Sequence, residues 1–301
     1  MSIDSSLKEK FGRQIYFKEN LSKYSWFNLG GPAEIFFRPD SIDQLISFLK
    51  FFIKQKKKIN IIGAGSNTLI REGGVEGVTI KLSSKFSYIK LLEKDVIQAG
   101  AATLQRTLSE FATKNSLTGF EFLSCIPGSV GGGIKMNSGC YNEEISKIIF
   151  SLEVIDQDGN VKEIKRNQIK FFYRGCNLED NLIILSAKFK GCLSEKKNIE
   201  NKQFQLIQRK KESQPSQVKT CGSTFKNSKD KKAWELIKES NCEKMSVGNA
   251  KISEKHCNFF INEGDATSQD IEELINKVKK KVFEKTNINL ELEIKILGKN
   301  K

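Results

Sequence analysis

The stretch from Glu121 to Tyr141 constrains this chain most, because it is dense in glycine. After Pro127 come Gly128, Gly131, Gly132, Gly133 and Gly139. Glycine lacks a Cβ, so its backbone reaches φ > 0 and lets a ligand approach closely, while proline fixes φ at the entry. The exposed N–H groups of such a loop suit a pyrophosphate. A tight turn that packs a strand on a helix explains the glycines equally well, and both interpretations stay open.

A second glycine loop follows a predicted strand near residue 60. Lys58–Ile62 is rich in isoleucine, as expected of a buried strand, and leads into Gly63-Ala64-Gly65-Ser66-Asn67. From the residues alone, this segment is either a plain strand-to-loop turn or part of a ligand site.

Two common nucleotide-binding motifs do not fit these loops. Gly128 and Gly133 have the spacing of the phosphate loop of nucleoside triphosphatases, but Ile134 stands where that loop needs lysine. In the first loop, Thr68 stands where a Rossmann turn needs its third glycine. Nicotinamide binding by that route is therefore excluded.

The net charge of +14 over 301 residues is of the kind found in proteins that bind nucleic acid. Lysine supplies most of this charge, and it is spread along the chain among acidic residues. We therefore expect no nucleic-acid partner. A positive field also attracts an anionic substrate such as a nucleotide sugar.

The cysteines and the apolar segments indicate the cellular compartment of the protein. Seven cysteines form no C-x-x-C pair, which is typical of free thiols in a reducing cytosol. No apolar run approaches eighteen residues, so we expect no membrane insertion. His256 is the single histidine, and no metal site is expected. The sequence predicts a cytoplasmic protein.

Strand and helix patterns mix without regular β-α alternation, which predicts the α+β class. Strands are predicted at 34–37, 78–82, 88–92, 96–99, 150–155, 161–164, 183–189 and 289–297. Asp158-Gly159 is a hairpin signal. Helices are predicted after two N-cap residues, which are Ser41 (in a capping box with Gln44) and Thr103. Further helices are predicted near 233–238 and after Thr267.

A composition change near Cys192 predicts a domain boundary. Ser194–Ser213 is polar and lysine-rich, with a weak helical stripe. We expect residues 1–192 to form one region of two α+β subdomains, divided near residue 60. Residues 193–301 would form a smaller domain whose last strand returns to the active site.

The two loops resemble the flavin loops of the UDP-N-acetylenolpyruvoylglucosamine reductase family, which acts in bacterial peptidoglycan precursor synthesis. The resemblance rests on strand-G-x-G-S-N in the first loop and on IPGSVGG (126–132) and MNSGCY (136–141) in the second. Further segments similar to family motifs are FFYRG (171–175), CGSTFKN (221–227), SEKHCNF (253–259) and LELEIKI (290–296). The similarity runs from about Ser25 to Gly298. The length matches the shorter, second type of the family.

The resemblance implies an FAD-binding domain like that of the vanillyl-alcohol oxidase superfamily, followed by a substrate-binding domain. Residues matched to cofactor binding are Gly63, Ala64, Gly65, Ser66, Asn67, Pro127, Gly128, Ser129, Gly131, Gly132, Asn137 and Gly139. Residues matched to substrate binding are Tyr173, Lys226, Asn227, His256 and Lys295.

Three residues match catalytic positions of the family. Arg174 would polarise the enolpyruvyl carboxylate, a task that suits a permanently charged, bidentate donor. Ser223 would be the proton donor, which requires a dry and ordered site because a hydroxyl is a weak acid. Glu293 would be the catalytic acid. From the residues alone they are a solvated arginine, a turn serine and a glutamate on the exposed face of an edge strand.

The chain departs from the family pattern in four places. Leu292 replaces a proline, Lys295 an arginine and Ser228 a proline, and Glu243-Lys244 stands where Lys-Gly is expected. These departures bear on substrate contacts rather than on the reaction.

The resemblance implies a monomeric UDP-N-acetylmuramate dehydrogenase with non-covalent FAD. NADPH would reduce the flavin, and UDP-N-acetylglucosamine enolpyruvate would then be reduced to UDP-N-acetylmuramate. Two alternatives remain at this point. One is another flavin oxidoreductase on the same scaffold, such as a sugar-lactone oxidase, and the other is a basic, non-enzymatic nucleotide- or nucleic-acid-binding protein.

Overall fold

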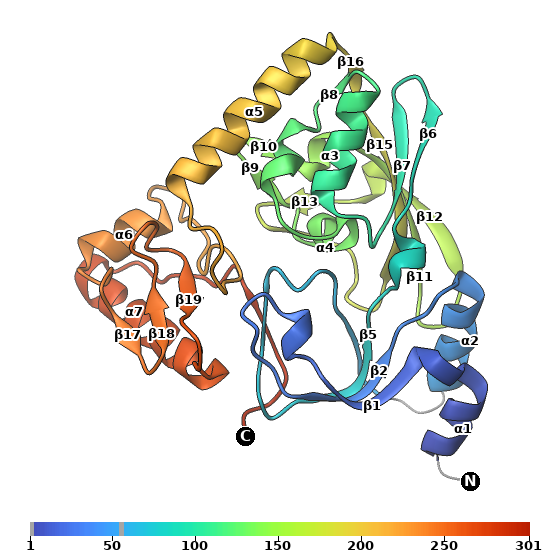
Figure 1. Cartoon of the computed structure of the whole chain (residues 1–301), viewed down its shortest axis with the longest axis horizontal. Helices are drawn as coiled ribbons and strands as arrows, with labels where there is room; N and C mark the ends of the chain where they lie inside the picture. The colour runs from blue at the N-terminus through green and yellow to red at the C-terminus, as the bar shows by residue number, and fades with distance from the viewer. Residues whose placement is uncertain (1–2, 54–56) are drawn as a thin grey trace. The chain divides into compact units, whose positions relative to one another are not determined.

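The computed structural model describes residues 3–53 and 57–301. They divide into two compact units (Figure 1). The first unit holds the described residues up to Phe17, of Ile35–Ala64, and Gly77–Lys210. The second unit holds Lys18–Glu34, Gly65–Glu76 and Lys211–Lys301. Helices and strands in both units confirm the α+β class. The predicted contiguous division after residue 192 stays a prediction.

An antiparallel five-stranded sheet is the centre of the first unit. Its order is β12 (Val161–Lys165), β11 (Ile149–Ile155), β15 (Ile183–Lys190), β7 (Val96–Gly100) and β6 (Ile89–Glu93). The predicted hairpin at Asp158-Gly159 joins β11 to β12 and is confirmed. Helix α4 (Val130–Lys135) contacts β7 and β15, and Figure 1 shows α3 (Gln105–Lys114) on the same side. Their apolar residues form one buried cluster.

A second apolar cluster of this unit lies under two helices, α1 (Ile3–Phe11) and α2 (Ile42–Phe52). Phe37 and Phe48 stack there with ring centroids 3.8 Å apart. Ser41 caps α2 as predicted, but the Gln44 side chain accepts from the Asp40 N–H and not from that of Ser41. The capping box is therefore only half formed.

The remaining strands of the first unit are short or cross the unit boundary. A four-stranded sheet has the order β1 (Ile15–Asn20), β2 (Pro32–Phe37), β5 (Val75–Ile80) and β3 (Ile59–Ile61). Two-stranded pairs are β8 (Leu117–Thr118) with β16 (Cys192–Leu193), β9 (Gly139–Cys140) with β10 (Glu143–Glu144), and β13 (Phe171–Phe172) with β14 (Gly175–Cys176). The lysine-rich segment forms α5 (Lys196–Ser213), in which the boundary falls.

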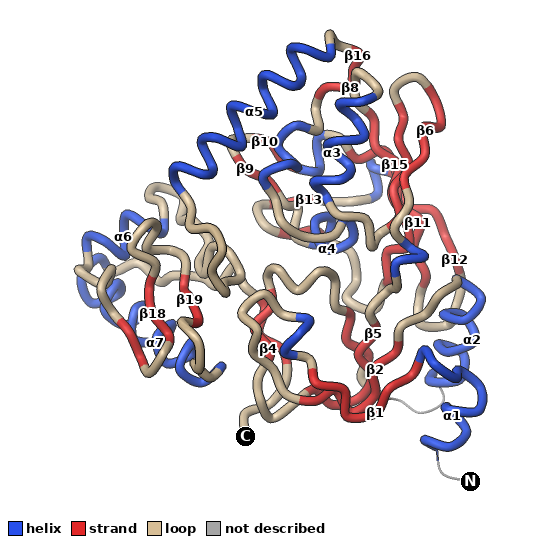
Figure 2. Tube along the Cα trace, in the orientation of Figure 1, coloured by secondary structure: helices blue, strands red, loops and turns tan. Residues whose placement is uncertain are grey.

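The second unit is built around α7 (Ser268–Thr286). A three-stranded sheet of β17 (Ser246–Val247), β18 (Ala250–Ile252) and β19 (Phe260–Asn262) lies beside this helix, and α6 (Ala233–Glu239) also contacts it (Figure 2). Strand β20 (Lys295–Leu297) pairs in parallel with β4 (Thr68–Ile70). The apolar face of α7 closes the core of this unit.

The N-terminus of α7 has a complete capping box. The Thr267 hydroxyl accepts from the Asp270 N–H at 3.0 Å, and the Asp270 carboxylate accepts from the Thr267 N–H at 2.8 Å. We expect Thr267→Ala to cost about 0.5–2 kcal/mol and to lower the thermal midpoint, whereas Thr267→Ser should stay near the parent. Calorimetry of the three proteins checks this, and equal midpoints for Ala and Ser would contradict it.

Two predicted boundaries are wrong. Helix α3 begins at Gln105 rather than after Thr103, because the Thr103 hydroxyl donates to the Tyr88 carbonyl oxygen at 3.0 Å instead of capping the helix. The closing strand, predicted from 289, is regular only over Lys295–Leu297, because the preceding residues pair with the loop around Phe225 through an isolated bridge.

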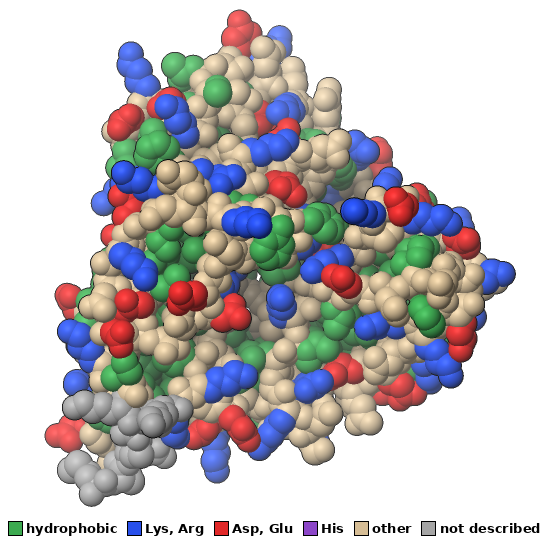
Figure 3. Space-filling model, turned by 180° about the vertical axis from the view of Figure 1, so that it is seen from behind, with side chains coloured by type: hydrophobic (Ala, Val, Ile, Leu, Met, Phe, Trp, Pro, Cys, Tyr) green, Lys and Arg blue, Asp and Glu red, His purple; other side chains and the backbone are tan. Residues whose placement is uncertain are grey.

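Lysine and arginine side chains are scattered among acidic ones over the face seen in Figure 3. Within residues 3–53 and 57–301, no helix combines the length and the apolar character needed to cross a bilayer.

Candidate active site

The glycine-rich stretch folds into a turn followed by a short helix. Gly128 has φ +134°, a conformation that favours glycine. Ser129 caps α4, and its hydroxyl accepts from the Gly132 N–H at 3.4 Å. The N–H groups of Val130 and Gly131 donate to backbone carbonyl oxygens at 2.8 and 2.9 Å. The N–H groups of Val130, Gly131 and Gly132 therefore already have acceptors. A pyrophosphate at this turn would bind the Ser129 hydroxyl or other backbone N–H groups.

Packing requires part of the glycine run. A Cβ at Gly131 would lie 3.1 Å from the Cβ of Ala101, and a Cβ at Gly133 would lie 2.8 Å from the amide of Gln105. Helix α4 thus approaches its neighbours more closely than a larger residue allows. The turn-packing interpretation accounts for these two glycines, whereas a Cβ at Gly132 would meet only the Ser129 hydroxyl, at 3.4 Å.

Gly63 brings the first loop against the second. A Cβ at Gly63 would lie 2.7 Å from the Ser129 Oγ, so the two glycine loops touch within the first unit. The Lys81 ammonium donates to the Gly63 carbonyl oxygen. Burial lowers the pKa of Lys81, and the nearby Arg38 charge lowers it further. The start of the first loop therefore lies against Ser129 of the second loop.

Arg174 lies at the tip of a tight hairpin in the same unit. Phe172 pairs with Gly175, which leaves Tyr173 and Arg174 as the turn. Arg174 has φ +58° and its guanidinium donates to the Gly139 carbonyl oxygen at 3.1 Å. The guanidinium also lies 4.9 Å from the centre of the Tyr173 ring. The predicted catalytic arginine is thus attached to the end of the glycine-rich stretch.

Asn137 braces this hairpin from inside the fold. Its side chain is 1% exposed. The Nδ2 group donates to the Phe172 carbonyl oxygen at 3.1 Å and to the Glu144 carboxylate at 2.9 Å, while Oδ1 accepts from the Ser146 N–H. These bonds occupy the amide and give Asn137 a positioning role. Gly139, two residues further on, cannot carry a Cβ because the Cβ would overlap the Glu143 carbonyl oxygen.

The second unit brings Ser223 and Glu293 onto neighbouring backbone segments. The Glu293 N–H donates to the Thr224 carbonyl oxygen at 2.9 Å, and the Lys226 N–H donates to the Glu291 carbonyl oxygen at 2.8 Å. The serine loop and the closing segment therefore run side by side. Ser223 and Glu293 are both partly buried, so neither side chain lies freely in solvent.

Asn67 ties the first loop to the Glu293 segment. Its Nδ2 group donates to the Glu293 carbonyl oxygen at 3.0 Å, and its own carbonyl oxygen accepts from the Lys295 N–H at 2.9 Å. In the same loop, Gly65 has φ +72° and its carbonyl oxygen accepts from the Trp26 N–H. The second unit thus holds one end of this loop, and the unit boundary falls between Ala64 and Gly65.

Asn258 is a functional support that the sequence prediction missed. It is 3% exposed, and its side chain both accepts from the Phe225 N–H at 3.0 Å and donates to the Phe225 carbonyl oxygen at 2.8 Å. This pair of bonds fixes the loop that carries Ser223. The available signal in the sequence was an asparagine between Cys257 and Phe259, two residues of types that are usually buried.

The predicted substrate residues of the second unit have structural partners. The Asn227 Oδ1 accepts from the Ala233 N–H at 3.0 Å at the start of α6, and the Lys226 ammonium lies 3.4 Å from the Glu291 carboxylate. The His256 ring lies edge-on to Phe259, and burial lowers the pKa of His256, so it is neutral at pH 7. Among the described residues, no group of three His, Cys, Asp or Glu side chains could hold a metal ion.

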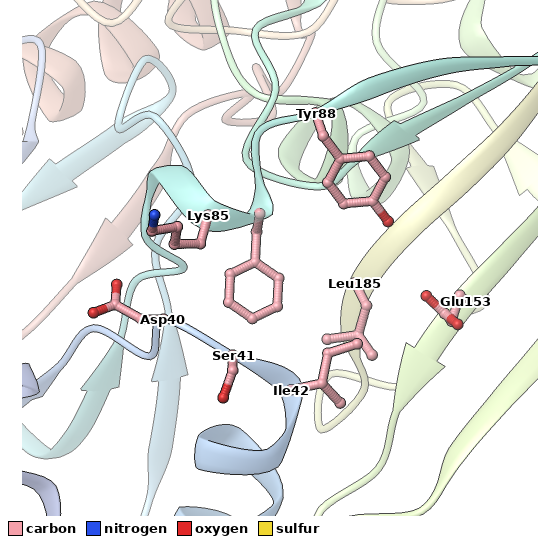
Figure 4. A pocket seen from close by; sticks show the side chains of 8 residues that line it. Asp40, Ser41, Ile42, Lys85, Tyr88, Glu153 and Leu185 are labelled. Atoms are coloured by element: carbon pink, nitrogen blue, oxygen red, sulfur yellow. The ribbon is translucent and has the colours of Figure 1, made fainter.

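Figure 4 shows a pocket of about 110 Å³ in the first unit, between the start of α2 and the sheet. Its polar side chains come from Asp40, Ser41, Lys85, Tyr88 and Glu153. None of the predicted site residues lines it.

Comparison with known proteins connects these features. A family profile described as the C-terminal domain of UDP-N-acetylenolpyruvoylglucosamine reductase matches residues 214–297, and one described as an FAD binding domain matches residues 33–165. The chain is 48% identical over 302 residues to the UDP-N-acetylenolpyruvoylglucosamine reductase of Pelagibacter ubique, covering 99% of this chain and 100% of that protein. The chain belongs to the UDP-N-acetylenolpyruvoylglucosamine reductase family.

Other members of this reductase family agree. The reductase of Wolbachia pipientis wMel is 43% identical, over 92% of this chain and 94% of that protein. The crystal structure of the reductase from Thermus caldophilus superposes with a TM-score of 0.82 at 28% identity, covering 94% of this chain and 98% of that one. The predicted family and fold class are confirmed, and the FAD binding domain holds both the Gly63 loop and the Ser129 loop.

Two departures from the reductase family pattern have a simple structural basis. The bridge beside Leu292 uses the N–H of Glu293 and the carbonyl oxygen of Glu291, so pairing makes no demand on the N–H of residue 292. Either proline or leucine fits there. Ser228 closes its turn with its hydroxyl, which donates to the Lys231 carbonyl oxygen at 2.8 Å.

Proposed function

We propose that this chain is an FAD-dependent UDP-N-acetylmuramate dehydrogenase that uses NADPH to reduce UDP-N-acetylglucosamine enolpyruvate. The observation that carries the proposal is the contact of the two glycine loops at Gly63 and Ser129, with Arg174 attached to Gly139 at the end of the second loop. Sequence identities of 48% and 43% to two reductases of the family, over nearly the full length of the chain, support the proposal.

The residues at the two loops fit FAD. Gly63 lets the two loops approach each other closely, because a Cβ there would lie 2.7 Å from the Ser129 Oγ. Residues 63–67, 127–129, 131, 132 and 139 would hold the cofactor, with Asn137 as a brace. The Lys81 ammonium holds the Gly63 carbonyl oxygen of the first loop. Bound FAD supplies the hydride transfer from NADPH to the enolpyruvyl group.

The proposed catalytic residues act on the enolpyruvyl group. Arg174 binds its carboxylate and stabilises negative charge that develops there, because a guanidinium stays charged and donates twice. The bond to Gly139 pre-orders this arginine before substrate arrives. Ser223 gives a proton to C2, and Glu293 stabilises the same developing charge as an acid. Tyr173, Lys226, Asn227, His256 and Lys295 would contact the substrate.

The visible spectrum tests the proposal most simply. We expect flavin bands at about 370 and 450 nm, a property of the cofactor itself. NADPH should bleach them and sugar lactones should not. A colourless protein would favour a non-enzymatic binding protein, and bleaching by lactones would favour a lactone oxidase. We further propose that the enzyme is a cytoplasmic monomer, which light scattering can check.

The cofactor should be tightly but non-covalently bound. His256 lies outside both loops, which leaves no histidine for a covalent link there. Acid precipitation should leave the yellow colour in the supernatant. Colour that stays with the pellet would contradict non-covalent binding.

A further inference from the structure

A buried thiol connects two segments of the second unit that lie far apart in the sequence. Cys221 is 2% exposed, and its Sγ lies 3.3 Å from the Thr68 carbonyl oxygen and 3.6 Å from the Gly65 carbonyl oxygen. All three residues belong to the second unit. The thiol has one proton to donate, so this proton is shared between two backbone carbonyl oxygens.

The two acceptors of this thiol are held by other groups as well. The Ser25 hydroxyl donates to the Thr68 carbonyl oxygen at 2.7 Å, and the Trp26 N–H donates to the Gly65 carbonyl oxygen at 3.1 Å. The Ser25 Oγ lies 4.0 Å from the Cys221 Sγ. Ser25 and Trp26 therefore fix the same two carbonyl oxygens to which the thiol donates.

Burial keeps this thiol in the protonated form. It raises the pKa of Cys221 to about 11, so the side chain carries its proton at neutral pH. A carbonyl oxygen accepts a hydrogen bond only from the protonated thiol, because a thiolate has no proton to donate. The state of the side chain at neutral pH is therefore the one that the two contacts require.

The segments that the thiol joins carry residues of the proposed reaction. Gly65 and the two residues after it belong to the loop proposed to hold FAD, and Ser223, the proposed proton donor, follows two residues after Cys221. Between them, a Cβ at Gly222 would meet nothing within 4 Å, so no described atom packs against that side of the backbone. The hydrogen bonds of Cys221 are thus an anchor immediately before Ser223.

We propose that Cys221 is a positioning residue, whose S–H group holds the Ser223 segment against Gly65 and Thr68 and so places the Ser223 hydroxyl for proton transfer. The inference rests on the proposed function, because Ser223 has a chemical role only in that reaction. Cys221 itself acts through Ser223 and not on the reacting atoms. Small displacements of a reacting group lower rates even when they arise some distance from the chemistry.

Separate measurement of the two half-reactions tests this role. Under anaerobic conditions, NADPH should reduce the flavin of Cys221→Ala at nearly the parent rate. Reoxidation by UDP-N-acetylglucosamine enolpyruvate should be slower by about 2- to 10-fold, the rate equivalent of one ordinary hydrogen bond. Cys221→Ser should recover part of this loss, because a hydroxyl also donates. Reoxidation of Cys221→Ala at the parent rate, or equal slowing of both half-reactions, would overturn the proposal.

A double variant shows whether Cys221 acts through Ser223. In a protein that already carries Ser223→Ala, the further change Cys221→Ala should not slow reoxidation again, since the group that it positions is absent. A general loosening of the fold would slow reoxidation in both backgrounds by the same factor, and that result would overturn the proposal.

Cys242 provides the matched control. It is also fully buried in the second unit, but its thiol donates at 3.5 Å to the carbonyl oxygen of Ser240, only two residues away. Cys242→Ala should lower the thermal midpoint and keep both half-reactions at the parent rates. Slowing of reoxidation by Cys242→Ala to the same extent as by Cys221→Ala would contradict a specific role for Cys221.

The parent protein separates this inference from the proposed function. A parent whose reduced flavin is not reoxidised by UDP-N-acetylglucosamine enolpyruvate would overturn the proposed function, and the positioning role with it. A parent that is reoxidised by this substrate, together with an unaffected Cys221→Ala, would overturn the positioning role alone.

Infrared spectroscopy tests the hydrogen bond without reference to turnover. The difference spectrum of the parent minus Cys221→Ser isolates the S–H stretching band of Cys221. We expect this band at neutral pH, at a lower frequency than that of a simple thiol in an apolar solvent, because donation to a carbonyl oxygen weakens the S–H bond. A band at the frequency of the simple thiol, or no S–H band at neutral pH, would overturn the proposal.

Discussion

Ser223→Ala should keep its FAD and be reduced by NADPH at nearly the parent rate, but pass electrons to UDP-N-acetylglucosamine enolpyruvate far more slowly. In the proposed mechanism this hydroxyl acts only when the enolpyruvyl group takes its proton at C2. Losing a positioned general acid costs about 10²–10⁴-fold in rate, or about 3–5 kcal/mol of barrier. Stopped-flow absorbance at about 450 nm follows both half-reactions, since the band belongs to the cofactor.

Matched variants make this test specific. Ser228 lies in the same segment, but its hydroxyl only closes a turn with Lys231, so Ser228→Ala should behave like the parent in both half-reactions. Ser223→Cys should recover part of the lost rate, because a thiol can also donate a proton. Glu293→Gln should show the same asymmetry as Ser223→Ala. If the reduced flavin of Ser223→Ala is reoxidised by UDP-N-acetylglucosamine enolpyruvate as fast as that of the parent, Ser223 is only a turn residue.

Gly65→Ala should lower the thermal midpoint strongly and release FAD. A Cβ at Gly65 would overlap the carbonyl oxygen of Tyr24, which is backbone and cannot rotate away, and the φ of +72° adds strain. Overpacking costs about 1–3 kcal/mol, and a non-glycine residue at positive φ adds about 1 kcal/mol. If the full cost fell on cofactor binding, the dissociation constant of FAD would rise by about 30- to 10³-fold.

Gly222→Ala is a control that distinguishes the steric clash with Tyr24 from the backbone strain of a positive φ. Its φ of +78° nearly equals that of Gly65, but a Cβ there would meet nothing within 4 Å. Gly222→Ala should therefore show only the cost of positive φ and retain FAD. Calorimetry and fluorescence titration with FAD measure both effects. Equal losses for Gly65→Ala and Gly222→Ala would show that the contact with Tyr24 does not matter.

The sequence predicted features that depend on local chemistry. The helix after Thr267, the Asp158-Gly159 hairpin and the α+β class follow from turn residues and periodicity within a few residues. The prediction for Thr103 failed because its hydroxyl bonds the carbonyl oxygen of Tyr88, a residue on another segment. No local pattern reports such a competing partner.

The candidate site shows the same division. Motif resemblance selected Ser223 and Arg174, but the sequence could not show that Asn258 fixes the Phe225 backbone or that Arg174 takes a positive φ to reach Gly139. It also could not divide the glycines into those needed for packing, such as Gly133, and those beside the other loop, such as Gly63. These distinctions depend on segments far apart in the chain.

Product analysis tests the proposed activity most directly. The purified protein is incubated with UDP-N-acetylglucosamine enolpyruvate and NADPH. The mass of the nucleotide sugar is then measured by mass spectrometry, and the consumption of NADPH is followed by its absorbance. The proposed function predicts that one NADPH is consumed for each nucleotide sugar that becomes heavier by two hydrogen atoms, with the mass of UDP-N-acetylmuramate. An unchanged nucleotide sugar, with NADPH consumed no faster than in its absence, would contradict the proposed function.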